Sequence, residues 1–138
     1  MRRYAHFVSI VGGIVLILAG LATWIFVSIT LGDQKITVSD DAACLAGDEV
    51  DGPFSAWCEA LIIDEHARSA TGGKTYAELD RDDPLRQVAM NAAFLQSSLY
   101  TSVVAFGVAG MAMLMGLVFV LLGLGMKDVS ERLAARDS

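Results

Sequence analysis

Two long stretches of this chain contain no Asp, Glu, Lys or Arg, and they constrain its fold more than any other feature. They run from Tyr4 to Gly32 and from Gln87 to Met126. Hydrophobic residues make up 54% of the sequence, and its mean hydropathy of +0.53 is high for a water-soluble domain of 138 residues. Because the apolar excess lies in these two stretches, we expect both to lie in an apolar environment.

Each uncharged stretch is long enough to cross a lipid bilayer as a helix. Residues 7–31 would rise about 37 Å as an α-helix, whereas the hydrocarbon core of a bilayer is about 30 Å thick. The second stretch is apolar on every face through residues 98–126, unlike an amphipathic soluble helix. We therefore predict an all-α membrane protein with a two-helix transmembrane hairpin, in which residues 7–31 and 98–126 form the spans.

A cleaved signal peptide is the alternative interpretation of the first stretch. Arg2 and Arg3 precede an apolar run with small residues near Gly20, a pattern that such peptides share. The apolar run continues through Ile29, however, well beyond a usual signal core. We therefore predict a retained span.

Basic residues near the spans predict the orientation of the hairpin, because cytoplasmic flanks carry an excess of Lys and Arg. Those outside the spans at either end of the chain are Arg2, Arg3, Lys127, Arg132 and Arg136. The connecting residues 32–97 carry thirteen acids and five bases. We predict a plasma-membrane protein with cytoplasmic ends at residues 1–6 and 127–138 and an acidic, helical extracytoplasmic domain at 32–97.

Cys44 and Cys58 are the two cysteines of the chain, and both lie in the predicted extracytoplasmic domain. Thiols outside the cytoplasm are normally oxidised, and a small domain gains much from a covalent link. A bridge closing about fifteen residues would contribute about 3 kcal/mol in the chain-entropy model. Metal binding is the alternative, but no histidine lies at a ligand-like spacing. We predict a disulfide.

Start and stop signals predict two helices in the extracytoplasmic domain. Pro53 is at a favoured first helical position after Asp51 or Gly52, and this helix should end near Gly72 and Gly73. Thr75 and Glu78 form a capping-box pattern for one further turn. A helix starting at Pro84, capped by Asp82 or Asp83, meets no breaker before Gly107. We predict that it continues unbroken into the second span.

Apolar periodicity predicts how these two helices pack. On the first helix, the face expected to pack comprises Phe54, Trp57, Cys58, Leu61 and Ile62, with Ser55, Glu59 and Arg68 on other sides. On the second helix, the expected partners are Leu85, Val88, Met90, Phe94 and Leu95. The extracytoplasmic domain should therefore be a rigid helical cap.

Several motifs that suggest ligands are incomplete. GGKT at residues 72–75 resembles the end of a phosphate loop, but Arg68 stands where that pattern needs glycine. An acidic cluster comprises Asp40, Asp41, Asp48, Glu49 and Asp51. It lacks the EF-hand register, so a solvated acidic face is expected, with loose divalent-cation binding as the alternative. His6 and His66 lie too far apart in the predicted topology to share a metal ion.

The spans contain no acid or base, which argues against a transporter, a pump or a redox carrier. They do contain small residues at positions that let helix backbones approach closely. The predicted helix-packing positions are Gly12, Gly13, Gly20, Ala105, Ala109 and Gly116. These positions serve either the hairpin itself or a membrane partner.

Three segments of the sequence resemble a known group of proteins. KITVSDDAACLAGDEVDGPFSAWCEA, ATGGKTYAELDRDDPLR and SLYTSVVAFGVAG are similar to small two-span actinobacterial membrane proteins catalogued as "aromatic ring-opening dioxygenase, LigA". The resemblance covers roughly residues 31–110. The catalogue name implies extradiol ring cleavage, which uses ferrous iron held by histidines and a carboxylate. On the predicted extracytoplasmic side this chain offers His66 alone, and its spans offer no histidine. No residue role is therefore carried over, and the resemblance implies a small two-span envelope protein.

These observations together predict a non-catalytic accessory or stabilising subunit of a larger integral membrane complex, such as a respiratory supercomplex or envelope machinery. The alternative is an autonomous homo-oligomer whose acidic outer cap senses or binds cations. In either case the chain lies in the lipid bilayer. We expect no enzymatic activity, no cofactor, no resident metal and no nucleic-acid partner.

Overall fold

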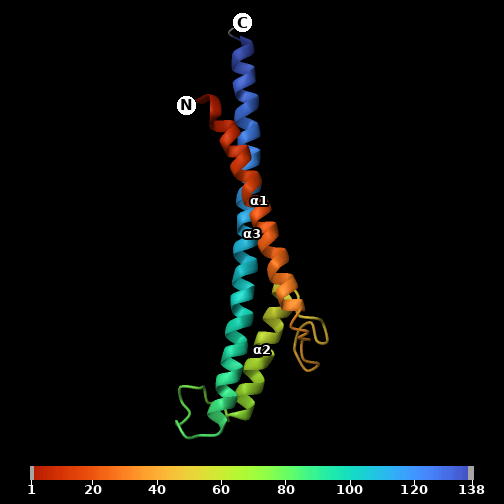
Figure 1. Cartoon of the computed structure of the whole chain (residues 1–138), viewed down its shortest axis with the longest axis vertical. Coiled ribbons are helices and arrows are strands. Elements are labelled where there is room, and N and C mark those ends of the chain that lie inside the picture. The colour runs from red at the N-terminus through yellow and green to blue at the C-terminus, as the bar shows by residue number, and fades with distance from the viewer. Residues whose placement is uncertain (1, 137–138) are drawn as a thin grey trace. The chain divides into compact units, whose positions relative to one another are not determined.

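Three helices form the regular structure of the chain. The computed structural model describes residues 2–136, except for the side chains of Arg2, Arg3, Ala134 and Arg136. α1 runs over Arg2–Gly32, α2 over Pro53–Ala70 and α3 over Leu85–Arg136 (Figure 1). The described residues contain no strand, only one isolated antiparallel bridge between Thr37 and Glu49. The predicted all-α class is confirmed, while three of the side chains used to predict orientation, Arg2, Arg3 and Arg136, lie outside the description.

Two of the helices are long and apolar enough to cross a membrane. The candidate spans are Tyr4–Gly32 in α1 and Leu85–Leu133 in α3, both longer than the predicted 7–31 and 98–126. The C-terminal residues after 126 had no predicted helix, yet α3 continues through them to Arg136. Ion pairs one turn apart support this extension: Lys127 with Glu131, and Asp128 with Arg132 at 2.9 Å.

The predicted boundaries of the other helical segments are confirmed. Gly52 is the N-cap of α2, and the helix ends before Gly72 and Gly73, which take positive φ angles of 64° and 84°. Asp83 Oδ1 accepts the Leu85 backbone N–H at 2.8 Å and so caps α3. The capping pattern at Thr75 forms a turn without a helix.

The chain divides into two compact units, which we describe separately. The first unit combines Met1–Ile25 with Gly107–Ser138, and the second unit is the continuous segment Phe26–Phe106. α1 and α3 contribute residues to both units, whereas α2 belongs entirely to the second.

In the first unit, α1 and α3 pack antiparallel along a line of small residues, which we call the glycine seam (Figure 1). A Cβ atom placed on Gly13 would lie 2.5 Å from the Gly116 carbonyl oxygen, and the reverse distance is also 2.5 Å. One placed on Gly20 would lie 2.7 Å from the Ala109 carbonyl oxygen. The full seam comprises Gly13, Gly20, Ala109, Gly116 and Gly123.

Seam residues recur every seven positions on each helix, which is the period of left-handed coiled-coil packing. Ser9 adds a polar link across the pair, because its hydroxyl donates to the Phe119 carbonyl oxygen at 2.7 Å. Two of the predicted packing positions lie elsewhere. Gly12 is exposed with nothing near it, and Ala105 belongs to the second unit.

In the second unit, α2 lies alongside the first part of α3 and runs antiparallel to it (Figure 1). The predicted packing face was correct only in part. Cys58 and Ile62 are buried, but Phe54, Trp57 and Leu61 are exposed. The buried face of α2 instead contains the small residues Ser55, Ala56 and Ala60 together with Glu59. Small side chains let the two helices approach closely, which large aromatic side chains on that face would prevent.

The predicted contacts from α3 were also wrong, since Leu85, Val88, Met90, Phe94 and Leu95 are all exposed. Ala89 and Leu99 are buried in their place. Between them, the Gln96 side-chain amide donates to the Ala60 carbonyl oxygen at 3.1 Å. At the other end of the contact, the rings of Trp57 and Tyr100 meet edge to face with centroids 5.4 Å apart.

We predict that Gly13→Ala destabilises the first unit, because the new methyl group meets the backbone of the facing helix. Overpacking of this kind costs about 1–3 kcal/mol. Gly12→Ala is the matched control, since a methyl group there meets nothing and alanine favours a helix by up to about 1 kcal/mol. Thermal unfolding in detergent, followed by circular dichroism, measures both. Equal melting temperatures for the two variants would contradict the seam.

Candidate functional site

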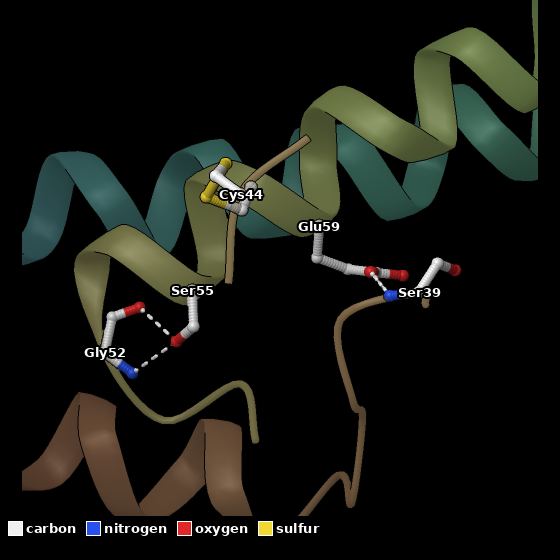
Figure 2. The surroundings of a disulfide bond; sticks show 6 residues. Ser39, Cys44, Gly52, Ser55 and Glu59 are labelled. Atoms are coloured by element: carbon white, nitrogen blue, oxygen red, sulfur yellow. Dashed lines mark hydrogen bonds between the residues drawn. A yellow bond between two sulfur atoms is a disulfide. The ribbon is translucent and has the colours of Figure 1, made fainter. Parts of the chain in front are cut away.

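The loop between α1 and α2 is fixed to α2 by a disulfide and a hydrogen bond. Cys44 and Cys58, fourteen residues apart in sequence, form the predicted disulfide (Figure 2). One residue further along α2, the Glu59 Oε2 atom accepts the Ser39 backbone N–H at 3.0 Å. These two links hold both ends of the acidic segment between Ser39 and Cys44 against the helix.

Glu59, like Ser55, is a polar residue that the sequence analysis placed incorrectly. It was assigned to a side of α2 away from the packed face, yet it is only 7% exposed. Its place follows from the small residues around it, because Ser55, Ala56 and Ala60 leave room for the loop to approach. The small residues, and not the spacing of the aromatic residues, are therefore the sequence feature that indicates the buried face of α2.

The start of α2 is also fixed to the end of α1 within the second unit. The Ser28 hydroxyl donates to the Asp51 carbonyl oxygen at 2.5 Å. Ser55 closes the first turn, since its hydroxyl oxygen lies 3.2 Å from both the N and the O atoms of Gly52 (Figure 2). Val38 and Val50, on the two arms of the loop, are fully buried. The loop is thus a packed element and not a free tether.

A groove of about 620 Å³ opens in the second unit between the end of α1, the inner face of α2 and the first part of α3. We call it the Glu59 groove. Most of its wall is apolar, with Phe26, Val27 and Ala105 among its lining residues. Polar groups also line it, and they include Gln34 and Glu59. A cavity of this size lies within the range of small-molecule and lipid sites.

The acidic cluster does not form a metal site in the described residues. Asp40, Asp41, Asp48, Glu49 and Asp51 are all exposed or near the surface. Among the residues that the structure describes, no three His, Cys, Asp or Glu side chains are grouped so that they could hold a metal ion. The cluster as placed is a solvated acidic surface.

One member of that cluster is paired with the histidine of the second unit. His66 Nε2 on α2 lies 2.7 Å from Asp41 Oδ2 on the loop. The hydrogen bond to Asp41 raises the pKa of His66 above its ordinary value of 6.5, and the charges of Glu65 and Glu59 act in the same direction. The same bond lowers the pKa of Asp41 below its ordinary value of 3.8. The pair is a third attachment of the loop to α2, and protonation of His66 strengthens it.

Comparison with known proteins adds no family to this geometry: no family model, no curated protein and no solved structure matches the chain.

We predict that the loop attachment at His66 depends on pH. The pair contributes fully between the ordinary pKa of Asp41, 3.8, and that of His66, 6.5. Its contribution is lost as the pH rises through the raised pKa of His66 and as the pH falls through the lowered pKa of Asp41. Asp41→Asn should lower the pKa of His66 markedly. Glu65→Gln should lower it less, because Glu65 acts through its charge alone.

Proton NMR of the two histidine rings across a pH series, on the full chain in detergent micelles, measures this difference. Glu65→Gln is the matched control, since it removes one negative charge without removing the hydrogen bond. Equal changes in the pKa of His66 for the two variants would show that the pair is not formed.

Proposed function

We propose that this protein is a non-catalytic integral membrane subunit that packs against a larger membrane complex. In this proposal α1 and α3 cross the plasma membrane as a hairpin with both ends in the cytoplasm, and the disulfide-bearing part of the chain lies outside. A respiratory assembly or an envelope machine is the kind of complex we expect. The two long apolar helices support the membrane placement, and the basic flanks support the orientation.

One observation carries the proposal of a partner: the second unit exposes large aromatic side chains that a free water-facing domain would bury. Phe94 on α3 is 79% exposed and Phe54 on α2 is 77% exposed. Next to Phe94, Met90 and Leu95 are exposed as well. Met90 and Phe94 are four residues apart and so lie on one face of α3. Exposed apolar patches mark interaction surfaces, and aromatic side chains are enriched where proteins bind one another.

The small residues of the glycine seam are not the surface that we propose for the partner. Gly13, Gly20, Ala109 and Gly116 are occupied by the packing of α1 against α3. They are therefore not free to receive a second protein. We place the partner surface on the exposed apolar residues of the second unit instead.

A second candidate function is a pH response of an autonomous envelope protein, which the His66–Asp41 pair favours. The pair joins the acidic loop to α2, and the pKa of His66 is raised from 6.5. External acidification would charge His66 and tighten the loop against α2. The cation-binding form of this hypothesis has weaker support, because the acidic side chains of the described chain are not grouped as ligands.

Purification of the tagged protein from its native membrane in a gentle detergent tests the leading proposal. We expect a defined set of membrane-complex subunits to copurify in a fixed stoichiometry, as identified by mass spectrometry. Phe94→Ala should reduce their recovery by about tenfold or more, since truncating a central interface aromatic commonly costs at least about 2 kcal/mol.

Gln87→Ala is the control, because it truncates an exposed side chain of the same helix without removing apolar surface. Recovery of the wild-type chain alone would refute the accessory role and leave the pH response as the better proposal. Equal loss of partner subunits in both variants would refute the assignment of the surface to Phe94.

A further inference from the structure

The Glu59 groove has an apolar part and a polar part. The positions of its lining residues along α1 and α3 show which part lies toward the candidate membrane spans. Phe26 and Val27 lie about one and a half turns before the end of α1, inside the first candidate span, whereas Gln34 lies just beyond that helix. On α3, Ala105 lies further into the second candidate span than Leu95. The groove therefore runs from the part of the helices that we place in the membrane toward the part that we place outside it.

Glu59 gives the polar part of the groove a carboxyl group that no basic side chain of the described residues pairs. Its side chain lines the groove and is 93% buried, as its 7% exposure shows. In the described part of the chain, no Lys or Arg forms an ion pair with it. A buried carboxylate is costly unless it is paired or hydrogen-bonded.

Among the described residues, Glu59 receives one side-chain hydrogen bond, which leaves most of its acceptor capacity free. Ser39 donates its backbone N–H to Oε2 (Figure 2), whereas an ionised carboxylate accepts about four hydrogen bonds. A ligand in the groove that carries N–H donors and a positive charge would satisfy the remaining lone pairs. An anionic head group would be repelled.

We propose that the Glu59 groove binds one phospholipid with a primary-amine head group, drawn from the outer leaflet of the membrane. Its acyl chain lies against Val27 and Ala105, and its ammonium group donates hydrogen bonds to the Glu59 carboxylate. This inference rests on the membrane placement in the proposed function. It adds a ligand class and a residue that selects the head group.

Head-group chemistry distinguishes this ligand from other membrane lipids. An ethanolamine head group carries three N–H donors on a compact cation. A choline head group has the same charge but no N–H, and a glycerol head group leaves the phosphate charge uncompensated. Glu59 should therefore prefer ethanolamine to choline and choline to glycerol.

The test uses the full chain reconstituted in nanodiscs that contain equal amounts of ethanolamine, choline and glycerol phospholipids of the same chain length. After transfer to detergent, native mass spectrometry counts the lipids that remain bound. We expect one retained lipid per chain with a strong preference for ethanolamine. Glu59→Gln keeps an acceptor for Ser39 but loses the charge, and should reduce the preference over choline by about tenfold.

Two tryptophan substitutions on α1 test whether the acyl chain occupies the groove, one inside it and one outside it as a control. Val27 lines the groove, whereas Ile29 is exposed and does not line it. Val27→Trp should abolish lipid retention, and Ile29→Trp should leave it unchanged. Circular dichroism of both variants checks that the helices are intact, and Glu59→Gln tests the groove without adding volume.

Three results would overturn the inference: equal retention of ethanolamine and choline lipids by the wild-type chain, equal retention by the two tryptophan variants, or no retained lipid. Carbonate extraction of the native membranes distinguishes failure of the lipid-site proposal from failure of the proposed membrane placement. A chain that stays in the membrane pellet but retains no lipid refutes the groove alone. A chain released into the supernatant refutes the membrane placement, and the lipid site with it.

Discussion

Backbone amides and carbonyls in apolar surroundings must find their partners within the chain, and this constraint governs both long helices. Helices satisfy it locally, because every N–H bonds to a carbonyl four residues back. The hydroxyl groups in the apolar stretches obey the same rule. Thr23, Thr30 and Thr101 each donate to the carbonyl oxygen four residues earlier in the helix. These three hydroxyl groups then need no water, and the contact between helices can be made by backbone approach.

The sequence predicted the helices well and their faces poorly. Charge-free stretches, Pro53 and the glycines after α2 are local signals, so the order and boundaries of the helices followed from them. The disulfide followed from the number of cysteines and the expected compartment. Which side of α2 is buried depends on what approaches it from far along the chain, and Ser39 lies twenty residues before Glu59. Aromatic periodicity therefore indicated a face that this chain leaves exposed.

The loop between α1 and α2 combines strong attachment with high charge. Its covalent bond at Cys58, the carboxylate of Glu59 and the imidazole of His66 all lie within about two turns of α2. The acidic side chains between them remain on the surface and keep the loop hydrated. A helix that holds a charged loop on one side and exposes Phe54 and Trp57 on another has two chemically different surfaces. One of these surfaces suits water, and the other suits a protein or a lipid.

The glycine seam has a consequence for how this sequence tolerates change over time. Helices that meet through backbone atoms direct most of their Leu, Ile, Val, Met and Phe side chains outward. Any apolar side chain of suitable length serves at those outward positions, so substitutions among them should accumulate freely. The five seam positions admit almost no alternative residue. The information that specifies this helix pair is thus concentrated in a few of the smallest residues, spaced seven apart, and most of the apolar sequence around them can drift.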